Sequence, residues 1–248
     1  MINPYKDHSG SRKEQVQLMF DRIAGKYDRL NHVLSMNIDK RWRRKLVKII
    51  QSDIQNLYFE KAQIKILDEA TGTGDLAIAM HKSIRNAGIT GLDISSEMLK
   101  VARDKTSLFR PEIKLLEGDS ENLPFENHSF DVVTVAFGVR NFEDLDKGLS
   151  EMFRVLVPGG SVYILEFSKP DGRLFSSLYT FYSHKVLPLI ASLFTKEKTA
   201  YEYLPDSIEA FPYGAKMMGR ISGAGFISPQ YFPLSGGISA IYIARKQN

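Results

Sequence analysis

The chain has no cysteine. Disulfides, cysteine–zinc sites and thiolate nucleophiles are therefore excluded, and the absence fits a reducing compartment. No uninterrupted apolar run approaches the ~18 residues that a membrane-spanning helix needs. The N-terminal sequence MINPYKDHSG lacks the apolar stretch of a signal peptide. We therefore expect a soluble, cytoplasmic protein.

Excess charge is also scarce, with a net charge of only +4 over 248 residues. Much of it is local, because the run KRWRRK at residues 40–45 surrounds the only tryptophan. One interpretation is a solvated helix face. The other is a peripheral contact with an anionic membrane surface at the inner face, since basic residues beside tryptophan suit lipid headgroups. Because the charge is not spread along a groove and no nucleic-acid motif accompanies it, we expect no nucleic-acid partner.

Strand and helix patterns alternate through the middle of the chain. Helical spacing of apolar residues covers residues 12–50. Short β-rich runs then occupy residues 64–68, 89–93, 113–117, 130–137 and 161–167. Helical segments at 76–85, from Ser95 onward and at 145–156 separate most of them, and we interpret Pro158-Gly159-Gly160 as a helix stop and turn. This alternation predicts an α/β fold, a mostly parallel sheet with helices on both faces.

The C-terminal end departs from that alternation. The strand patterns at 230–234 and 238–244 are separated by Ser235-Gly236-Gly237, which predicts a hairpin and an antiparallel last strand. Residues 171–213 hold nine aromatics, more than a crossover helix needs. We expect one domain in four parts: an N-terminal helical cap (1–60), a cofactor-binding core (61–170), a helical substrate cap (171–215) and C-terminal strands (216–248).

The sequence ILDEATGTGD at residues 66–75 predicts a strand, a glycine turn and a helix start. The pattern G-x-G-x-x-A from Gly72 formally fits a dinucleotide. A pyrophosphate on a helix N-terminus is disfavoured by nearby anions, yet Asp68, Glu69 and Asp75 surround this turn. S-adenosyl-L-methionine has no phosphate and carries an ammonium. We therefore expect Asp68 to hold that ammonium and the N–H groups near Gly72 and Gly74 to bind its carboxylate, while Asp75 could equally cap the helix.

Two further carboxylates follow the next strands. Asp93 ends the second strand, where a carboxylate can bind a ribose diol through both oxygens. Such a contact suits S-adenosylmethionine and NAD alike. Asp119, with Ser120, follows the third strand, where an acid can accept from the adenine amino group. The alternative for Asp119 is an ordinary turn-forming aspartate.

The sequence FGVRNF at residues 137–142 follows the fourth strand and faces the same crevice. Its glycine permits a close backbone approach, and Arg140 and Asn141 add a cation and an amide. A surface ion pair of Arg140 with Glu143 or Asp144 is the alternative. We expect Arg140 and Asn141 to act on the substrate.

Several strings together resemble the ubiquinone/menaquinone biosynthesis C-methyltransferases (UbiE/MenG type). They are FDRIAGKYD (20–28), DSENLPF (119–125), FGVRN (137–141), LEFSKP (165–170) and YEYL (201–204). The resemblance runs nearly end to end. It implies a class I S-adenosylmethionine-dependent methyltransferase fold with a seven-stranded sheet. It also implies cofactor contacts at Thr73, Asp93, Asp119 and Ser120, and a substrate role for Arg140 and Asn141.

Two positions depart from the family pattern. Ala70 stands where many class I methyltransferases have the first glycine of the turn, and Ala136 where relatives often have a serine. The implied activity is methylation of a ring carbon of a polyprenyl quinol, demethylmenaquinol to menaquinol. In that reaction Arg140 would stabilise the phenolate, and a water held by Asn141 and a carboxylate would take the proton. No metal is expected.

Four alternatives stay open. The acceptor could be the benzoquinol of ubiquinone biosynthesis or another small molecule. The protein could instead be an NAD-dependent oxidoreductase, or a non-catalytic member of a quinone-synthesis complex. Neither the oligomeric state nor the prenyl tail length follows from the sequence.

Overall fold

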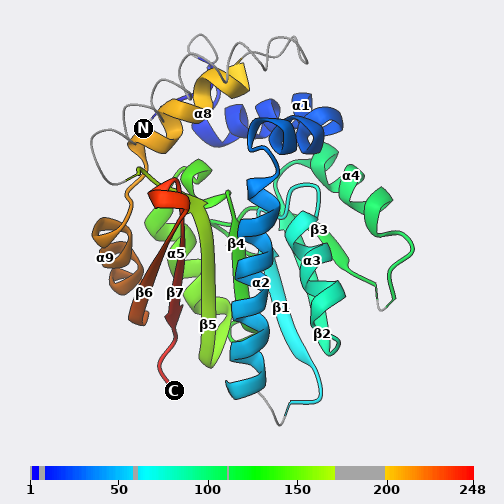
Figure 1. The fold of residues 1–248 in the computed structure, drawn as a ribbon, viewed down its shortest axis with the longest axis vertical. Helices are drawn as coiled ribbons and strands as arrows, with labels where there is room; N and C mark the ends of the chain where they lie inside the picture. The colour runs from blue at the N-terminus through cyan, green and yellow to red at the C-terminus, as the bar shows by residue number, and fades with distance from the viewer. Residues whose placement is uncertain (1, 6–8, 58–60, 111, 171–198) are drawn as a thin grey trace.

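A computed structural model describes residues 2–5, 9–57, 61–110, 112–170 and 199–248. Most of the aromatic-rich segment, residues 171–198, lies outside the described residues. Its described end is helix α8 (Thr199–Ala210). Figure 1 shows one sheet with helices on both faces and a further helical layer across one end.

The sheet has seven strands in the order β3-β2-β1-β4-β5-β7-β6. Neighbouring strands from β3 to β5 pair in parallel, and β7 runs antiparallel to both β5 and β6. This confirms the expected fold and the antiparallel last strand. The strands are β1 (Ile64–Glu69), β2 (Ala87–Asp93), β3 (Lys114–Glu117), β4 (Phe130–Ala136), β5 (Leu156–Phe167), β6 (Ile227–Leu234) and β7 (Ser239–Arg245).

The helices divide between the two faces and the carboxyl end of the parallel strands. Residues of α2 (Ile38–Leu57) and α3 (Asp75–Ser83) share one apolar core with the sheet, and residues of α5 (Leu145–Val155) and α9 (Ala215–Gly223) share the other. The long helix α1 (Arg12–Leu34) packs on α4 (Ser96–Thr106) and α8. Figure 1 shows α1 and α8 lying across the ends of the strands, so they cover the edge where a ligand site is expected.

The tryptophan of the basic run is not at the surface. Trp42 is only 6% exposed, and it packs against Phe137 and Phe167. Its indole N–H donates to Ser235 Oγ at 2.9 Å. Helical periodicity places it on the same buried stripe as Leu46, so a membrane contact of the basic run would be made by its cations and not by Trp42.

The Pro158-Gly159-Gly160 sequence is also not a simple stop and turn. Helix α5 ends at Val155, and β5 begins at the next residue and includes all three. Gly159 has φ of +75°, and the pairing with β4 shifts register between Phe130 and Val132. The pairing advances five residues on β5, from Leu156 to Ser161, against two on β4, so the expected turn interrupts the pairing inside the strand instead of preceding it.

None of the helices in the described ranges combines the length and apolar character required to cross a bilayer.

Candidate functional site

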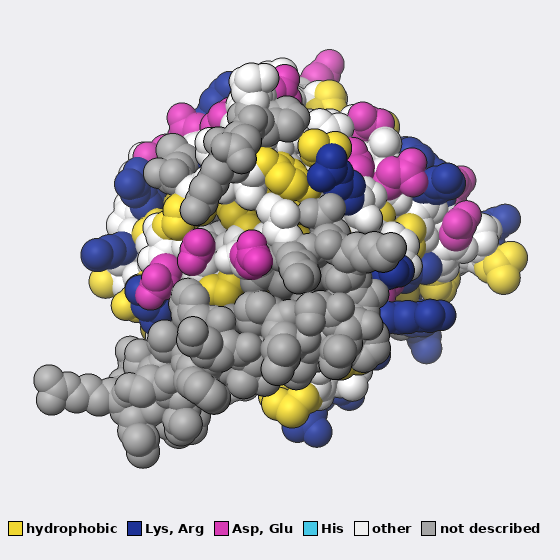
Figure 2. Space-filling model, turned by 90° about the horizontal axis from the view of Figure 1, so that it is seen from above, with side chains coloured by type: hydrophobic (Ala, Val, Ile, Leu, Met, Phe, Trp, Pro, Cys, Tyr) yellow, Lys and Arg dark blue, Asp and Glu magenta, His cyan; other side chains and the backbone are white. Residues whose placement is uncertain are grey.

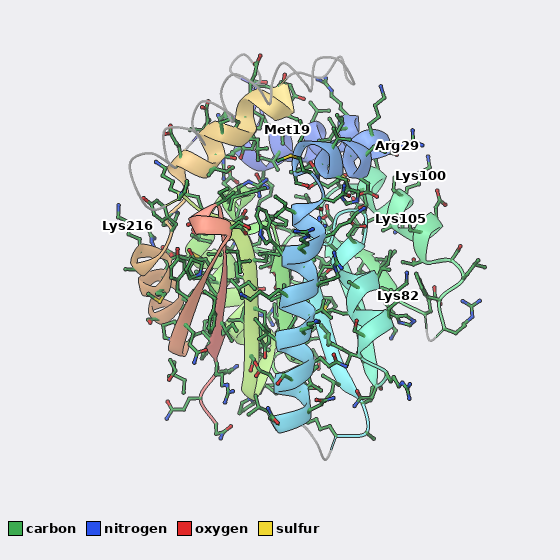
Figure 3. All side chains as sticks on the ribbon, viewed as in Figure 1. Met19, Arg29, Lys82, Lys100, Lys105 and Lys216 are labelled. Carbon is green, nitrogen blue, oxygen red and sulfur yellow. The ribbon has the colours of Figure 1, made fainter. Side chains whose placement is uncertain are left out.

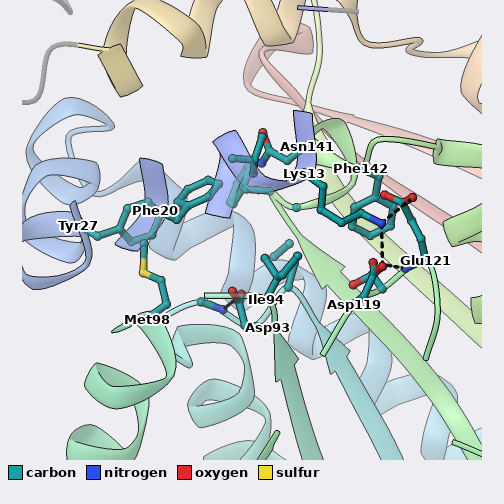
Figure 4. A pocket seen from close by; sticks show the side chains of 17 residues that line it. Lys13, Phe20, Tyr27, Asp93, Ile94, Met98, Asp119, Glu121, Asn141 and Phe142 are labelled. Carbon is teal, nitrogen blue, oxygen red and sulfur yellow. Dashed lines mark hydrogen bonds and ion pairs between the residues drawn. The ribbon is translucent and has the colours of Figure 1, made fainter. Parts of the chain in front are cut away.

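A pocket lies where the carboxyl ends of β1, β2 and β4 meet α1 (Figure 4). The space it encloses, counted together with the open solvent at its mouth, is about 680 Å³. It is lined by core residues (Ala70, Gly72, Asp93, Ile94, Met98, Asp119, Ser120, Glu121, Ala136, Phe137, Gly138, Asn141, Phe142) and by α1 residues (Lys13, Val16, Phe20, Tyr27).

The glycine turn has the conformation that its residues predict. Gly72 and Gly74 adopt φ of +57° and +82°, where glycine has no steric cost. Gly74 is the N-cap of α3 and has no side chain to cap that end, while the buried Asp68 carboxylate accepts from the backbone N–H of Ala77 in the first turn. Of these two glycines, Gly72 lines the pocket. A helix start beside a pocket suits the carboxylate of an amino-acid ligand.

Asp68 lies beneath this turn rather than in the pocket. It is 1% exposed, and its carboxylate accepts from Thr71 Oγ1 at 2.6 Å and from Thr134 Oγ1 at 2.7 Å. Burial raises the pKa of Asp68 to about 6 despite these bonds. Asp68 is not among the described residues that line the pocket. Its hydrogen bonds hold the turn, and its expected contact with the ammonium stays a prediction.

Asp93 lies at the end of β2 and does line the pocket. Its two oxygens accept from the backbone N–H groups of Gly72 at 2.7 Å and Ser95 at 2.8 Å. Burial raises the pKa of Asp93 to about 6, so the group is still mainly anionic at neutral pH. A carboxylate has about four acceptor positions. The N–H of Ile94 also bonds to this carboxylate, so three donors leave about one acceptor position for a ribose hydroxyl.

Asp119 and Ser120 line the pocket at the end of β3. Lys13 of α1 lies between Asp119 and Glu121, with Nζ–O distances of 2.7 Å and 3.2 Å (Figure 4). The sequence analysis did not include Lys13, because nothing local connects it to residues more than a hundred positions away. The ion pairs fasten the first turn of α1 over this end of the pocket.

Thr73 faces away from the pocket. It is 3% exposed, and its hydroxyl donates to Asp28 Oδ1 at 2.5 Å and accepts from Lys105 Nζ at 3.2 Å. Lys105, labelled in Figure 3, also pairs with Asp28 at 2.8 Å and with Asp75 at 2.6 Å. Thr73 and Asp75 thus belong to a charge network that joins α1, α3 and α4. Neither lines the pocket within the described part of the chain.

Arg140 is buried beside the pocket, in the short 3₁₀ helix η1 (Val139–Asn141). Its Nη1 lies 2.8 Å from Glu166 Oε1, with side-chain exposures of 6% and 0%. The alternative of a surface pair with Glu143 or Asp144 is therefore wrong. Its Nε has no hydrogen-bond partner among the described residues. The charge of Arg140 also acts on the phenol of Tyr27, whose pKa is raised by burial and lowered less by Arg140.

Asn141 lines the pocket and is half-buried. Its Oδ1 accepts from the hydroxyl of Tyr203 in α8 at 3.2 Å. Several residues of the site escaped the sequence analysis. Phe20 and Tyr27 appear there only as members of the family string at 20–28. Glu166 appears only as a member of the string at 165–170. The patterns themselves carried no indication that these side chains meet at one pocket.

Comparisons with known proteins decide the class of protein. Residues 8–246 match the ubiE/COQ5 methyltransferase family. The chain belongs to this family. The membership confirms an S-adenosylmethionine-dependent methyltransferase and removes the oxidoreductase alternative.

Individual relatives cover nearly all of this methyltransferase. A Bacteroides fragilis protein named demethylmenaquinone methyltransferase is 44% identical over 99% of this chain and 97% of its own. A Geotalea daltonii protein named ubiquinone/menaquinone biosynthesis C-methyltransferase UbiE is 44% identical over 94% and 97%. Among solved structures, a Thermotoga maritima S-adenosylmethionine-dependent methyltransferase, a possible histamine N-methyltransferase, aligns with a TM-score of 0.64 at 17% identity. That alignment covers 93% of this chain and 99% of the other, and it supports the fold.

Proposed function

We propose that this methyltransferase transfers a methyl group to a ring carbon of demethylmenaquinol to give menaquinol. The observation that carries the proposal is the name of relatives that are 44% identical over 94–99% of the chain. An acceptor with a polyprenyl tail also agrees with the apolar α1 residues of the pocket, Val16, Phe20 and Tyr27.

S-adenosylmethionine, when bound, supplies an electrophilic methyl on a sulfonium. We propose that Gly72, Gly74 and the start of α3 bind its amino-acid end. Asp93 would hold the ribose through its free acceptor position, and Asp119 with Ser120 would meet the adenine. Asp68 and Thr73 would act beneath these contacts by fixing the turn. The pocket-lining positions and hydrogen bonds given above support this arrangement.

On the acceptor side, a ring carbon becomes nucleophilic when a quinol hydroxyl loses its proton. That hydroxyl resembles a phenol, with a pKa of ~10. Arg140 stays protonated, and it would lower the cost of the phenolate through a fixed positive charge in a dry site. Its unpartnered Nε and its electrostatic effect on Tyr27, which lines the pocket, support this role. Glu166 would keep the guanidinium in place.

Helices α1 and α8 would exclude water from the acceptor side of the pocket. We infer that α1 and the described end of the 171–215 segment, α8, act as a cap over the acceptor. Residues of both helices share one apolar cluster, in which Met19, Leu30 and Tyr203 are buried. Charged intermediates gain more from fixed dipoles where water is excluded.

The direct test is mass spectrometry of lipid quinones from a strain that lacks the gene and from the same strain complemented. We expect demethylmenaquinone to accumulate and to disappear on complementation. An unchanged quinone profile would refute the proposal.

The benzoquinol of ubiquinone biosynthesis is a second candidate acceptor, because the Geotalea relatives carry a name that includes both quinones. Purified protein should be given each quinol in reduced form with labelled S-adenosylmethionine. Turnover of the benzoquinol at the rate of the naphthoquinol would support a dual activity.

We also propose a peripheral membrane contact at the corner between α1 and α2. Val33 and Met36 are 49% and 71% exposed there, and Lys40, Arg41 and Arg44 are exposed just beyond them. Apolar side chains beside cations suit an anionic bilayer surface, to which each nearby cation adds ~1 kcal/mol. Figure 2 shows basic and acidic side chains interspersed over the described surface of the α1–α8 side, so a contact would be local.

Vesicle sedimentation tests this contact. Binding to vesicles with 30% phosphatidylserine (roughly the anionic surface that attracts basic segments) should fall when Met36 and Arg41 are changed to serine. Equal binding by the variant, or by vesicles of pure phosphatidylcholine, would refute the contact.

A further inference from the structure

A chain of hydrogen bonds joins three elements that are distant in the sequence. Arg12 Nη2 in α1 donates to the Tyr203 hydroxyl in α8 at 3.0 Å. That hydroxyl donates to Asn141 Oδ1 in η1 at 3.2 Å. Arg12 and Tyr203 are 9% and 5% exposed, whereas Asn141 lines the pocket. The chain therefore runs from the buried cap to the acceptor side of the site.

The chemistry of the three groups agrees with the direction of both bonds. A guanidinium has donors and no acceptor, so the Tyr203 oxygen must accept from Arg12. The phenolic proton is then directed at Asn141 Oδ1. Because the carbonyl oxygen of the amide is its acceptor, this bond favours the flip that turns Nδ2 away from Tyr203.

Arg12 is itself held firmly. The same Nη2 donates to the carbonyl of Arg140 at 2.8 Å, and Nη1 donates to the carbonyls of Phe142 and, at 3.4 Å, Asn141. The backbone on both sides of Asn141 is therefore fastened to α1. With Oδ1 engaged, no described residue accepts a hydrogen bond from Asn141 Nδ2, which leaves that nitrogen available to a ligand.

We propose that Arg12 and Tyr203 are positioning residues that fix the Asn141 amide so that it offers N–H donors, and no acceptor, to a ring oxygen of the acceptor. The inference rests on the proposed quinol methylation and deepens it. Two donors recognise an anionic or carbonyl oxygen, whereas a free Oδ1 would favour a protonated hydroxyl. Asn141 therefore acts beside Arg140 in binding the deprotonated quinol oxygen. The quinol proton would pass to a water held by a nearby carboxylate, while Asn141 donates to the oxygen left behind.

The test measures kcat and KM for reduced demethylmenaquinol with one prenyl unit, at saturating S-adenosylmethionine. Tyr203→Phe removes only the hydroxyl, and we expect kcat/KM to fall about fivefold, the effect of one neutral hydrogen bond. S-adenosylmethionine affinity by calorimetry should stay within about twofold. In the background of Asn141→Ala, Tyr203→Phe should have no further effect, because Tyr203 acts through Asn141.

Asn141→Asp tests the direction of the amide. The aspartate still accepts from Tyr203 but presents an anion to the pocket, so we expect it to be no more active than Asn141→Ala. Higher activity of Asn141→Asp would mean that an acceptor is needed there and would overturn the inference. Multiplicative losses in the Tyr203→Phe/Asn141→Ala protein would overturn it too.

Tyr163→Phe is the matched control, since it removes a hydroxyl that donates to Asp53 at 2.8 Å, away from the pocket. We expect it to leave kcat/KM unchanged, alone or with Asn141→Ala. If the wild-type protein fails to methylate the quinol, the proposed function fails. If the wild type is active and Tyr203→Phe matches it, only this inference fails.

Discussion

A β-carbon added to Gly138 would lie 2.5 Å from the β-carbon of Ala70. The two residues follow neighbouring strands, β4 and β1, and both line the pocket. Ala70 has φ of +47°, a conformation that favours glycine. The methyl group of Ala70 thus occupies the space that Gly138 leaves open, which gives a physical reason for the departure from glycine at residue 70.

Gly138→Ala should therefore lower the free energy of unfolding by about 1–3 kcal/mol, the usual cost of overpacking. Ala70→Gly removes one of the atoms in the way, although Val135 Cγ2 would still lie 2.9 Å from the new β-carbon. The double variant should therefore recover part of the loss in a denaturant titration. Simple additivity of the two changes would contradict the packing argument.

Arg140→Ala should lower kcat about 10²–10³-fold, because it removes a fixed charge near the developing oxyanion. S-adenosylmethionine affinity should change little, since no described contact joins Arg140 to the cofactor-side residues. The measurement is steady-state kinetics with purified quinol, beside calorimetry. Unchanged kcat would exclude the assigned role.

Arg140 pairs with the buried Glu166, so the stability of the Arg140→Ala protein has to be measured as a control. Arg140→Ala leaves Glu166 without its cation, and breaking such a pair can cost about 3–5 kcal/mol. Burial raises the pKa of Glu166 and Arg140 lowers it, so loss of Arg140 should favour protonation of Glu166 and limit this cost. A double variant, Arg140→Met with Glu166→Met, should be at least as stable as Arg140→Ala and equally inactive.

Asp93→Ala should weaken S-adenosylmethionine binding by at least tenfold, as expected for loss of a charge-assisted contact. The pKa of Asp93 is raised to about 6, and ribose hydroxyls favour the anionic form. Affinity should therefore be flat above about pH 7 and decline as the pH falls through 6. Calorimetry from pH 5 to 8 measures the slope.

Asp68 has a pKa of about 6 as well, so it must be separated from Asp93. Asp68→Asn should keep the pH dependence of binding, because Asp68 lies beneath the turn. Asp93→Asn should abolish it. The opposite pattern would place the titrating contact at Asp68.

Asp75 should stabilise the fold in a pH-dependent manner. Burial raises its pKa, but Arg43 and Lys105 lower it further, and the net pKa is below the usual value. The stabilisation is therefore fully present above the unfolded pKa of about 3.9 and is lost as the pH falls through the folded value. Asp75→Asn should cost roughly 1–2 kcal/mol of unfolding free energy at pH 7, and the difference should vanish once the pH is below the folded pKa.

Asp146→Asn is the comparison for that titration. Asp146 pairs with Arg220, and both side chains are more than half exposed. Pairs of this kind contribute about 0–1 kcal/mol. An effect at Asp146 as large as that at Asp75 would show that the ion pairs of Asp75 with Arg43 and Lys105 stabilise the fold no more than an exposed pair does.

The elements with a local pattern were predictable from sequence. Alternating apolar runs defined the strands, and Gly72 and Asp93 lie at the pocket because strand ends of a parallel sheet share one edge. The basic run did not show that Trp42, whose neighbours in sequence are cations, lies on a buried helical face. Nor did the sequence show that the side chains of Asp68 and Thr73 bond to other protein groups, and the cofactor contacts of all these residues stay predictions.

What the sequence determined by itself was the order of elements, the cofactor turn and the family, because these depend on residues close together in the chain. Tertiary structure alone decided the direction of individual side chains. The Arg140–Glu166 pair and the Arg12–Tyr203–Asn141 chain join residues 26 to 191 positions apart. Such contacts are made by packing of whole helices and strands, and they leave no spacing pattern to detect.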